Sequence, residues 1–342
     1  MPADHPSSSV VAEPHGRDIV VVGASEGGTE ALSTFVAGLP ADLPAAVFVA
    51  MHARAGIESR LPELLTQRGP LRARHGIHGE AIAPGRIYVA PPDDHLLLRP
   101  GHVRVVRGPK ENGFRPSVDA LFRTASIAYG PRVIGVVLTG NLDCGTAGLL
   151  SIKARGGLAL VQDPREAAVP AMPRSAIEHV AVDQVAGLAS LSALVATLAA
   201  QPPGPRPEGL SREIAELEGD QPGAAAEIVC PICQGKLTET LVGGFSSFRC
   251  HVGHSFSLES VAAEQAEEVE RAMWASVRAL EESARLAQRL AASTIGEMQD
   301  RFAQKEETQM HHADVIRRLL LGGEMLTEAD AAQLDEAGSA KQ

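Results

Sequence analysis

The sequence is poor in aromatic residues, and it has no long apolar run. Aromatic side chains make up 3% of the 342 residues, so the interior has to be built mainly from aliphatic side chains. No apolar stretch approaches the roughly 20 residues that span a bilayer, and the N-terminus lacks a basic flank followed by an apolar segment. We therefore expect a cytoplasmic protein without membrane insertion.

Cysteine is also scarce, with four residues in the whole chain. Three of the four lie close together in one short C-terminal segment, which is unlike a disulfide framework in a chain of this length. Metal binding is the better explanation for that segment.

The negative charge is unevenly placed. The formal net charge is −11, yet residues 1–200 contain 18 basic and 18 acidic side chains, whereas residues 201–342 contain 13 basic and 24 acidic ones. Because phosphate backbones attract basic surfaces, this balance argues against a nucleic-acid partner, above all for the acidic tail.

Composition and periodicity divide the chain into five parts. Residues 1–16 lack periodicity and are predicted to form a flexible leader. Residues 17–200 alternate short apolar runs with helical spacing, and residues 201–226 form a Pro-rich, acidic linker. A small cysteine-containing module over 227–256 and a helical segment over 257–342 follow.

The alternation over 17–200 predicts an α/β domain with a doubly wound, mainly parallel sheet. Strands are expected at residues 18–22, 45–50 and 133–139, and helical spacing follows each of them, for the second over 56–67. In such sheets, functional residues gather at the carboxyl ends of the strands.

The first strand leads into a glycine-rich turn, Gly23-Ala-Ser-Glu-Gly-Gly28. The turn fits the Gly-x-Ser-x-Gly pattern, in which a serine is held on a tight corner beside free backbone N–H groups. A dinucleotide site is a weaker interpretation, because the glycines are not spaced as Gly-x-Gly-x-x-Gly and the second strand ends in His52 rather than an acid. Ser25 could also serve merely as a helix cap.

Three residues that suit a hydrolase follow strands of the predicted sheet. Ser25 follows the first strand, His52 ends the second, and Asp143 lies just beyond the strand at 133–139. An ester or amide hydrolase needs a nucleophile, a base within hydrogen-bond reach and a group that orients the base. We predict these roles for Ser25, His52 and Asp143, in that order.

Several motifs over residues 18–200 together resemble the catalytic domain of the bacterial chemotaxis receptor methylesterases of the CheB type. They are Gly23-Ala-Ser-Glu-Gly-Gly28, Met51-His52, Pro84-Gly-Arg-Ile-Tyr-Val-Ala-Pro91, Pro116-Ser-Val-Asp119, Leu138-Thr-Gly140 with Gly148-Leu149, and Met172-Pro173. The resemblance implies a two-component signalling enzyme that needs no catalytic cofactor. It would hydrolyse glutamate γ-methyl esters on the cytoplasmic helices of chemoreceptors, deamidate glutamines there, and contact other chemotaxis proteins. It further implies that Ser25 is the nucleophile, His52 its base, and the backbone N–H groups of Glu26 and Asn141 the oxyanion donors.

The chain departs from this family's pattern in three places. Glu26 replaces the usual threonine of the serine turn, and Cys144 stands where the family loop Leu-Thr-Gly-x-x-x-Asp-Gly has its aspartate. Asp143 is the neighbouring acid, so which residue orients His52 stays open; Cys144 is either a small buried residue or a reactive thiol. Sixteen leading residues are also too few for the receiver domain that these enzymes commonly carry, so we expect control from elsewhere.

The cysteine-containing module has metal-ligand spacing. Cys230-x-x-Cys233 is followed after sixteen residues by Cys250, with His251 and His254 close behind. Cys230, Cys233, Cys250 and His254 suit a structural, tetrahedral zinc site of the zinc-ribbon kind, with His251 as the reserve ligand. The alternative is a small β-hairpin with reduced cysteines in its core.

Beyond residue 257 the apolar residues recur at threes and fours, which predicts two helices, the second over 297–321. Their apolar stripe packs on a partner helix or another copy of the chain, or it docks receptors or kinases.

Two functions from different classes remain: a serine methylesterase, and a weak or inactive relative that acts as an interaction module through its zinc and helical tail. The pair Asp143-Cys144 discriminates between them.

Overall fold

The computed structural model describes residues 16–52, 59–219 and 223–322. The predicted leader, the start of the helical spacing at 56–58, part of the linker and the last twenty residues of the tail lie outside these ranges. The chain divides into two compact units, residues 1–261 and 262–342. Within the described ranges, no helix combines the length and the apolar character needed to cross a bilayer.

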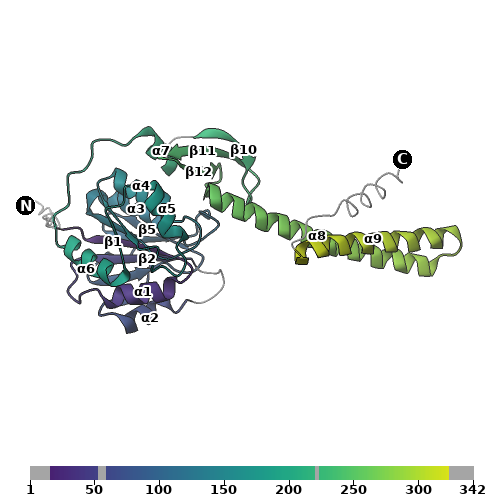
Figure 1. Ribbon diagram of the computed structural model, residues 1–342, viewed down its shortest axis with the longest axis horizontal. Helices are drawn as coiled ribbons and strands as arrows, with labels where there is room; N and C mark the ends of the chain where they lie inside the picture. The colour runs from purple at the N-terminus through teal and green to yellow at the C-terminus, as the bar shows by residue number, and fades with distance from the viewer. Residues whose placement is uncertain (1–15, 53–58, 220–222, 323–342) are drawn as a thin grey trace, which may run out of the picture. The chain divides into compact units, whose positions relative to one another are not determined.

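The first unit begins with an α/β domain in which strands and helices alternate (Figure 1). Its strands are β1 (Ile19–Ala24), β2 (Ala46–Met51), β3 (Arg72–His75), β4 (Arg86–Val89), β5 (His95–Arg99), β6 (His102–Val106), β7 (Val133–Val137), β8 (Leu158–Gln162) and β9 (Gln184–Ala186). Its helices are α1 (Gly28–Ala37), α2 (Leu61–Arg68), α3 (Val118–Tyr129), α4 (Thr146–Ala154), α5 (Ala171–His179) and α6 (Leu188–Ala199), with a short 3-10 turn at Gly130–Arg132.

The central sheet has seven strands in the order β3-β4-β2-β1-β7-β8-β9, and all its pairings are parallel. The predicted mainly parallel sheet is therefore confirmed. Strand β1 lies in the middle and pairs with β2 on one side and β7 on the other, so the carboxyl ends of these three strands meet at one edge. That edge is where the predicted hydrolase residues follow their strands.

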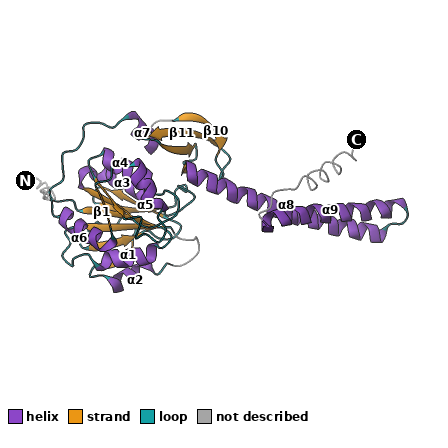
Figure 2. Cartoon of the chain, in the orientation of Figure 1, coloured by secondary structure: helices purple, strands orange, loops and turns teal. Residues whose placement is uncertain are grey.

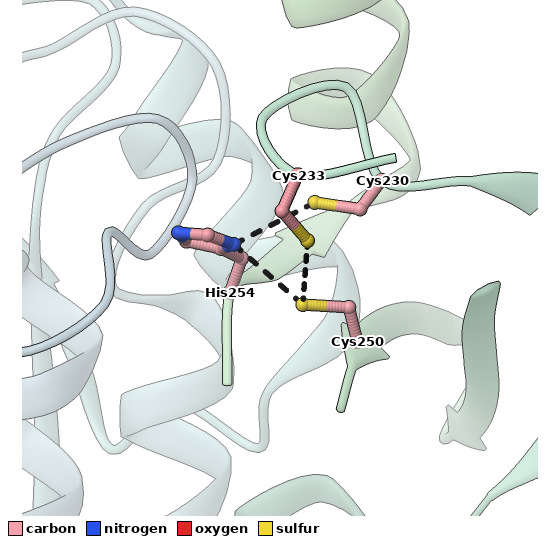
Figure 3. A group of neighbouring side chains, drawn as sticks. All are labelled: Cys230, Cys233, Cys250 and His254. Carbon is pink, nitrogen blue, oxygen red and sulfur yellow. Dashed lines mark hydrogen bonds between the residues drawn. The ribbon is translucent and has the colours of Figure 1, made fainter. Parts of the chain in front are cut away.

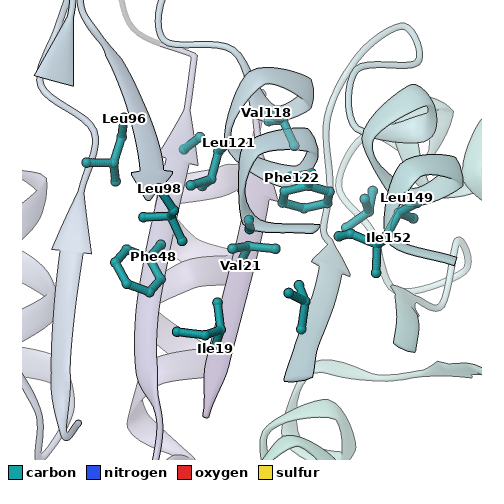
Figure 4. Packing of buried hydrophobic residues seen from close by; sticks show 14 of the residues in the cluster. Ile19, Val21, Phe48, Leu96, Leu98, Val118, Leu121, Phe122, Leu149 and Ile152 are labelled. Atoms are coloured by element: carbon teal, nitrogen blue, oxygen red, sulfur yellow. The ribbon is translucent and has the colours of Figure 1, made fainter. Parts of the chain in front are cut away.

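Both faces of the sheet are covered, which explains why its central strands β1, β2 and β7 are wholly apolar (Figure 2). On one face, α1, α2 and α6 bury Phe35, Leu65 and Leu191. On the other, α3, α4, α5 and the β5-β6 hairpin enclose a core that includes Phe48 and Phe122 (Figure 4). Aliphatic side chains dominate both cores, as the shortage of aromatic residues requires.

The segment predicted to be a plain linker has structure of its own. It contains α7 (Arg212–Glu218), which Ser211 caps by accepting a hydrogen bond from the backbone N–H of Ile214. Glu218 forms a buried ion pair with Arg155 at the end of α4. Composition indicated a linker because Pro and small residues surround this short helix. The ion pair between Arg155 and Glu218 joins positions far apart in the chain, so composition does not reveal it.

A second, small sheet follows, with the antiparallel order β10-β11-β12-β13. Its strands are β10 (Ala224–Val229), β11 (Lys236–Val242), β12 (Phe245–Cys250) and β13 (Ser255–Ser257). The module therefore starts and ends slightly outside the predicted 227–256.

In the described residues, the second unit is a hairpin of two helices, α8 and α9. Helix α8 spans Leu258–Ser293 and α9 spans Glu297–Gly322, close to the predicted bounds. Within the hairpin, small and β-branched side chains are buried, among them Ala284 and Ala313, and the guanidinium of Arg317 contacts the carboxylate of Glu281. The apolar stripe of this sequence thus packs in part between its own two helices.

Candidate active site

Ser25 sits on a corner fixed by the ends of two neighbouring strands. Its backbone N–H donates to the carbonyl oxygen of Thr139 at 3.0 Å, just beyond β7. The carbonyl of Ser25 accepts from the N–H of Gly28 at 2.9 Å, which closes the turn into α1. Gly27 has φ = 74°, a left-handed conformation that glycine adopts without strain. The glycine pattern therefore produces the sharp strand-to-helix corner that the sequence predicted.

Free backbone donors lie beside this corner. The N–H groups of Glu26 and Asn141 form no hydrogen bond with any residue in the described ranges. The Glu26 N–H belongs to the turn that leads into the N-terminus of α1, where partial positive charge favours an anion. Gly140 allows the close approach of the two loops, because a Cβ there would lie 2.8 Å from the Ser25 Cβ.

His52 reaches Ser25 from the end of the adjacent strand. The His52 backbone N–H donates to the Ala24 carbonyl at 3.3 Å, extending the β1-β2 pairing by one step. Its Nδ1 lies 2.9 Å from the Ser25 Oγ, within hydrogen-bond distance. The structure thus brings together the two residues that sequence reasoning placed at this edge.

The other face of the imidazole is enclosed by an aromatic ring. Phe114 stacks on His52 with ring centroids 3.7 Å apart and an interplanar angle of 6°. The His52 Nε2 is buried and has no hydrogen-bond partner among the described residues. Because burial penalises the charged imidazolium, the pKa of His52 falls to about 3. The His52 imidazole is therefore neutral at physiological pH, and within the described residues its ring plane is held by stacking on Phe114.

Asp143 does not orient His52 in this structure, contrary to the predicted role. Its Oδ1 accepts a 2.6 Å hydrogen bond from the hydroxyl of Ser257, on the last residue of β13. Burial raises the pKa of Asp143 to about 7, the Ser257 hydrogen bond opposes that rise, and the charge of Asp119 adds to it. The Asp143 carboxyl group instead contacts the small module. The two partners lie more than a hundred residues apart in the chain, so no local sequence pattern predicts this contact.

Cys144, at the family's acid position, is a buried thiol. Its Sγ lies 3.9 Å from the Oγ of Ser117, and burial, with the nearby Asp119 carboxylate, raises its pKa well above the ordinary value. Because the thiolate is the reactive form of cysteine, this burial disfavours a reactive role for Cys144. Of the two interpretations, the small buried residue fits the structure.

Sequence reasoning missed two residues that shape the site, Phe114 and Ser257. Phe114 is one of only eight phenylalanines and lies two residues before the Pro116-Ser-Val-Asp119 motif, which was a usable signal. Ser257 offered none, because its role depends on how β13 packs against the α/β domain.

The predicted metal ligands also come together. One ligand atom from each of Cys230, Cys233, Cys250 and His254 lies within 4.8 Å of the other three (Figure 3). His251, the reserve ligand, is exposed and outside this group.

Comparison with known proteins identifies the α/β domain. The model of the CheB methylesterase family matches residues 20–195. The chain is 42% identical over 168 residues to protein-glutamate methylesterase/protein-glutamine glutaminase 2 of Anaeromyxobacter dehalogenans, covering 49% of each chain. It is 38% identical over 178 residues to a putative protein of the same kind from Leptospira interrogans, covering 52% of this chain and 92% of that one.

A solved structure agrees with the sequence matches. The catalytic domain of Thermotoga maritima CheB methylesterase superposes with a TM-score of 0.52 at 31% identity, covering 53% of this chain and 98% of that domain. The chain spans about half the length of several curated relatives, including the Anaeromyxobacter protein. The family-level resemblance of the motifs is confirmed: this chain belongs to the CheB methylesterase family.

Proposed function

We propose that this chain is a serine hydrolase that cleaves glutamate γ-methyl esters, and the side-chain amides of certain glutamines, on the cytoplasmic helices of chemoreceptors or a related signalling protein. The observation that carries the proposal is the 2.9 Å contact between the Ser25 Oγ and the His52 Nδ1, beside two free backbone N–H groups. The names of the relatives supply the substrate class, since they combine methylesterase and glutaminase.

The reaction would proceed through an acyl-enzyme. Neutral His52 takes the hydroxyl proton as the Ser25 oxygen attacks the ester carbonyl, and the N–H groups of Glu26 and Asn141 hold the oxyanion. When the tetrahedral intermediate collapses, the ester C–O bond breaks and His52 returns the proton to the leaving oxygen, which releases methanol. Water, deprotonated by His52, then cleaves the acyl-enzyme to the glutamate carboxylate, and Ser25 regains its proton. Ammonia leaves in the corresponding amide reaction.

The environment of His52 limits the rate of this reaction. Among the described residues, no acid partners the second nitrogen of the imidazolium that forms in each transition state, and a serine hydrolase loses about 10⁴ in turnover when its orienting acid is neutralised. Stacking on Phe114 fixes the ring plane and supplies part of the missing orientation. We therefore expect a slow but measurable esterase.

The nucleophile can be tested without knowing the receptor. Incubation of the full chain with a fluorophosphonate probe, followed by mass spectrometry, should find the probe on Ser25. The variant Ser25→Ala should lose the label, and Ser33→Ala, on the neighbouring helix, should retain it. An unlabelled wild-type chain, under conditions that label another serine hydrolase, contradicts the proposal.

The second candidate is a weak or inactive relative that acts as an interaction module. Two observations favour it: the His52 Nε2 has no partner among the residues that the structure describes, and a cysteine stands at the family's acid position. Methanol release from a receptor fragment methylated in vitro separates the two functions, measured for the wild type, Ser25→Ala, Asp143→Asn and Cys144→Asp. If the wild type releases no methanol and Cys144→Asp restores release, the second function is correct.

A further inference from the structure

We propose that Cys230, Cys233, Cys250 and His254 bind a zinc ion, and that the metal-bound module positions the catalytic His52 through the turn Glu111–Phe114. The effect on turnover rests on the proposed function. The metal site and its link to His52 do not, because both can be measured without substrate.

The spacing of the four ligand atoms fits a tetrahedral metal ion. Cys233 Sγ and Cys250 Sγ lie 3.6 Å apart, and His254 Nδ1 lies 3.7 Å from Cys230 Sγ and 3.6 Å from Cys250 Sγ. Bonds of about 2.3 Å to sulfur and about 2.0–2.1 Å to nitrogen give tetrahedral edges of about 3.8 and 3.6 Å. A disulfide needs sulfurs about 2.05 Å apart, so these cysteines form no disulfide, and their sulfur atoms surround a common point. Three thiolates and one imidazole favour zinc.

The backbone around the ligands forms two tight turns. Cys230 donates its N–H to the Gly235 carbonyl at 2.8 Å and accepts from the Gln234 N–H at 2.7 Å. Cys250 likewise donates to the His254 carbonyl at 3.0 Å and accepts from Gly253 at 3.0 Å. Each turn presents its ligands to the same point, as the side chains in Figure 3 show.

The hydrophobic core of the module is small. Its buried core consists of six residues, and two of them are ligand cysteines. They are Cys230, Leu237, Phe248, Cys250, Phe256 and Val261. Units of about 40 residues usually need a metal, a disulfide or a partner to stay folded. A core of this size therefore argues for the metal and against a free-standing hairpin with reduced cysteines.

Strand β13, which follows His254, and the residues just after it form hydrogen bonds with Asn112 of the α/β domain. Asn112, a buried residue, donates its backbone N–H to the Ser255 carbonyl at 2.7 Å, and its Oδ1 accepts from the Ser257 N–H at 3.0 Å and the Ser260 hydroxyl at 2.8 Å. Its Nδ2 donates to Asp119 on α3 at 2.9 Å. Both polar atoms of the Asn112 side chain thus form hydrogen bonds, the Oδ1 with β13 and the residues just after it, and the Nδ2 with α3.

Asn112 belongs to the same turn as the ring that covers His52. Glu111 and Phe114 exchange backbone hydrogen bonds of 3.2 and 3.0 Å, which close the turn. Glu111 is anchored by a two-pronged ion pair with Arg123 on α3, with contacts of 3.0 and 2.5 Å. Phe114, at the other end of the turn, stacks on His52 at 3.7 Å. A displacement of β13 is therefore passed to His52 through a turn of four residues.

A second contact reaches the opposite side of the site. The Ser257 hydroxyl holds Asp143 at 2.6 Å, and Asp143 lies two residues from Asn141, the proposed oxyanion donor. Residues of β13 thus touch the loop that follows β7 as well as the turn that holds Phe114. Removing the metal releases both contacts, so we infer that zinc acts on the catalytic geometry and not only on the stability of the module.

The metal is tested first. Elemental analysis of the full chain, purified without added metal, should give one zinc per chain. His254→Ala should lose the zinc, and the matched control His251→Ala should keep it, because His251 lies outside the ligand group. No metal in the wild type, iron in place of zinc, or zinc retained by His254→Ala overturns the proposal.

The link to His52 is tested by NMR on histidine-labelled chain. Stacking on Phe114 gives the His52 ring protons a ring-current shift, which should be lost in His254→Ala and kept in His251→Ala. Ser257→Ala removes the hydroxyl contact with Asp143 but not the backbone N–H that donates to Asn112, so it should still bind one zinc and keep the shift. Turnover of methylated receptor should fall about tenfold in Ser257→Ala with KM unchanged, and Ser257→Thr, which retains the hydroxyl, should keep it. Unaltered His52 resonances in the zinc-free chain overturn the link, whereas absent turnover together with the expected NMR changes counts against the proposed function alone.

Discussion

The hydroxyl of Ser257 donates a 2.6 Å hydrogen bond to the carboxyl group of Asp143. Because of this contact, the carboxyl group nearest in sequence to the family's acid position binds the small module, and the buried Nε2 of His52 has no hydrogen-bond partner in the part of the chain that the structure describes. The proposed catalytic pair, Ser25 and His52, is consequently supported by the stacking of Phe114 on His52. The predictions below follow from this arrangement.

Asp143→Asn should leave the turnover of methyl ester within about tenfold of the wild type. The amide oxygen of the substituted residue can still accept the hydrogen bond from the Ser257 hydroxyl, and the substitution removes no contact with His52. If Asp143 did orient His52, the same change would lower turnover by about 10⁴. Steady-state methanol release separates these values, and Asp163→Asn, at an exposed loop, provides the control for a carboxylate-to-amide change.

The same substitution should alter how stability depends on pH. Burial raises the pKa of Asp143 to about 7, above its unfolded value of 3.8, so the unfolded chain loses this proton first as pH rises. The wild type therefore loses stability between about pH 4 and pH 7, by at most about 3 kcal/mol from pH 5 to pH 8. Asp143→Asn removes that loss, so its Tm relative to the wild type should be higher at pH 8 than at pH 5. A difference that does not change with pH would contradict the buried, protonated carboxyl.

The pH profile of kcat/KM should lack the usual histidine limb. With its pKa lowered to about 3 by burial, His52 remains neutral above about pH 4, so activity should not fall between pH 7 and pH 5 on its account. Phe114→Ala admits water to the ring, which should raise the pKa of His52 towards 6.5 and bring an acidic limb into that range. A wild-type limb near pH 6.5 would show that the ring is not desolvated.

Helix α3 offers a matched test of the core that supports the site. Phe122 is fully buried beneath α4, whereas Ile127 on the same helix is 42% exposed. Phe122→Ala should lower the free energy of unfolding by about 3–5 kcal/mol, and Ile127→Ala by less than about 1 kcal/mol. Urea denaturation measures both. Equal effects would mean that α3 does not pack as described.

Local patterns were sufficient to predict the sheet and the contact between Ser25 and His52. Short apolar runs identified β1, β2 and β7, and the rule that parallel strands share a carboxyl edge predicted that Ser25 and His52 lie together. The ligand spacing of Cys230, Cys233 and Cys250 likewise indicated a cluster. In each case the signal lies within a few residues of the feature.

The parts that sequence reasoning did not predict depend on contacts between distant segments. Asp143 and Ser257 are 114 positions apart, and the ion pair of Arg155 with Glu218 spans 63. Composition around α7 indicated a linker because it records residue types and not partners. The orientation of Asp143 is likewise set by which of two neighbours, the histidine or the module, offers it a hydrogen bond.

The most direct test of the account is methanol release by the full chain from a receptor fragment carrying labelled methyl esters, compared with Ser25→Ala and His52→Ala. We expect slow release by the wild type and none above background by either variant, with the folded state of all three verified by their Tm. Release that persists in Ser25→Ala, or a folded wild type that releases no methanol from a substrate that another member of the family cleaves, would contradict it.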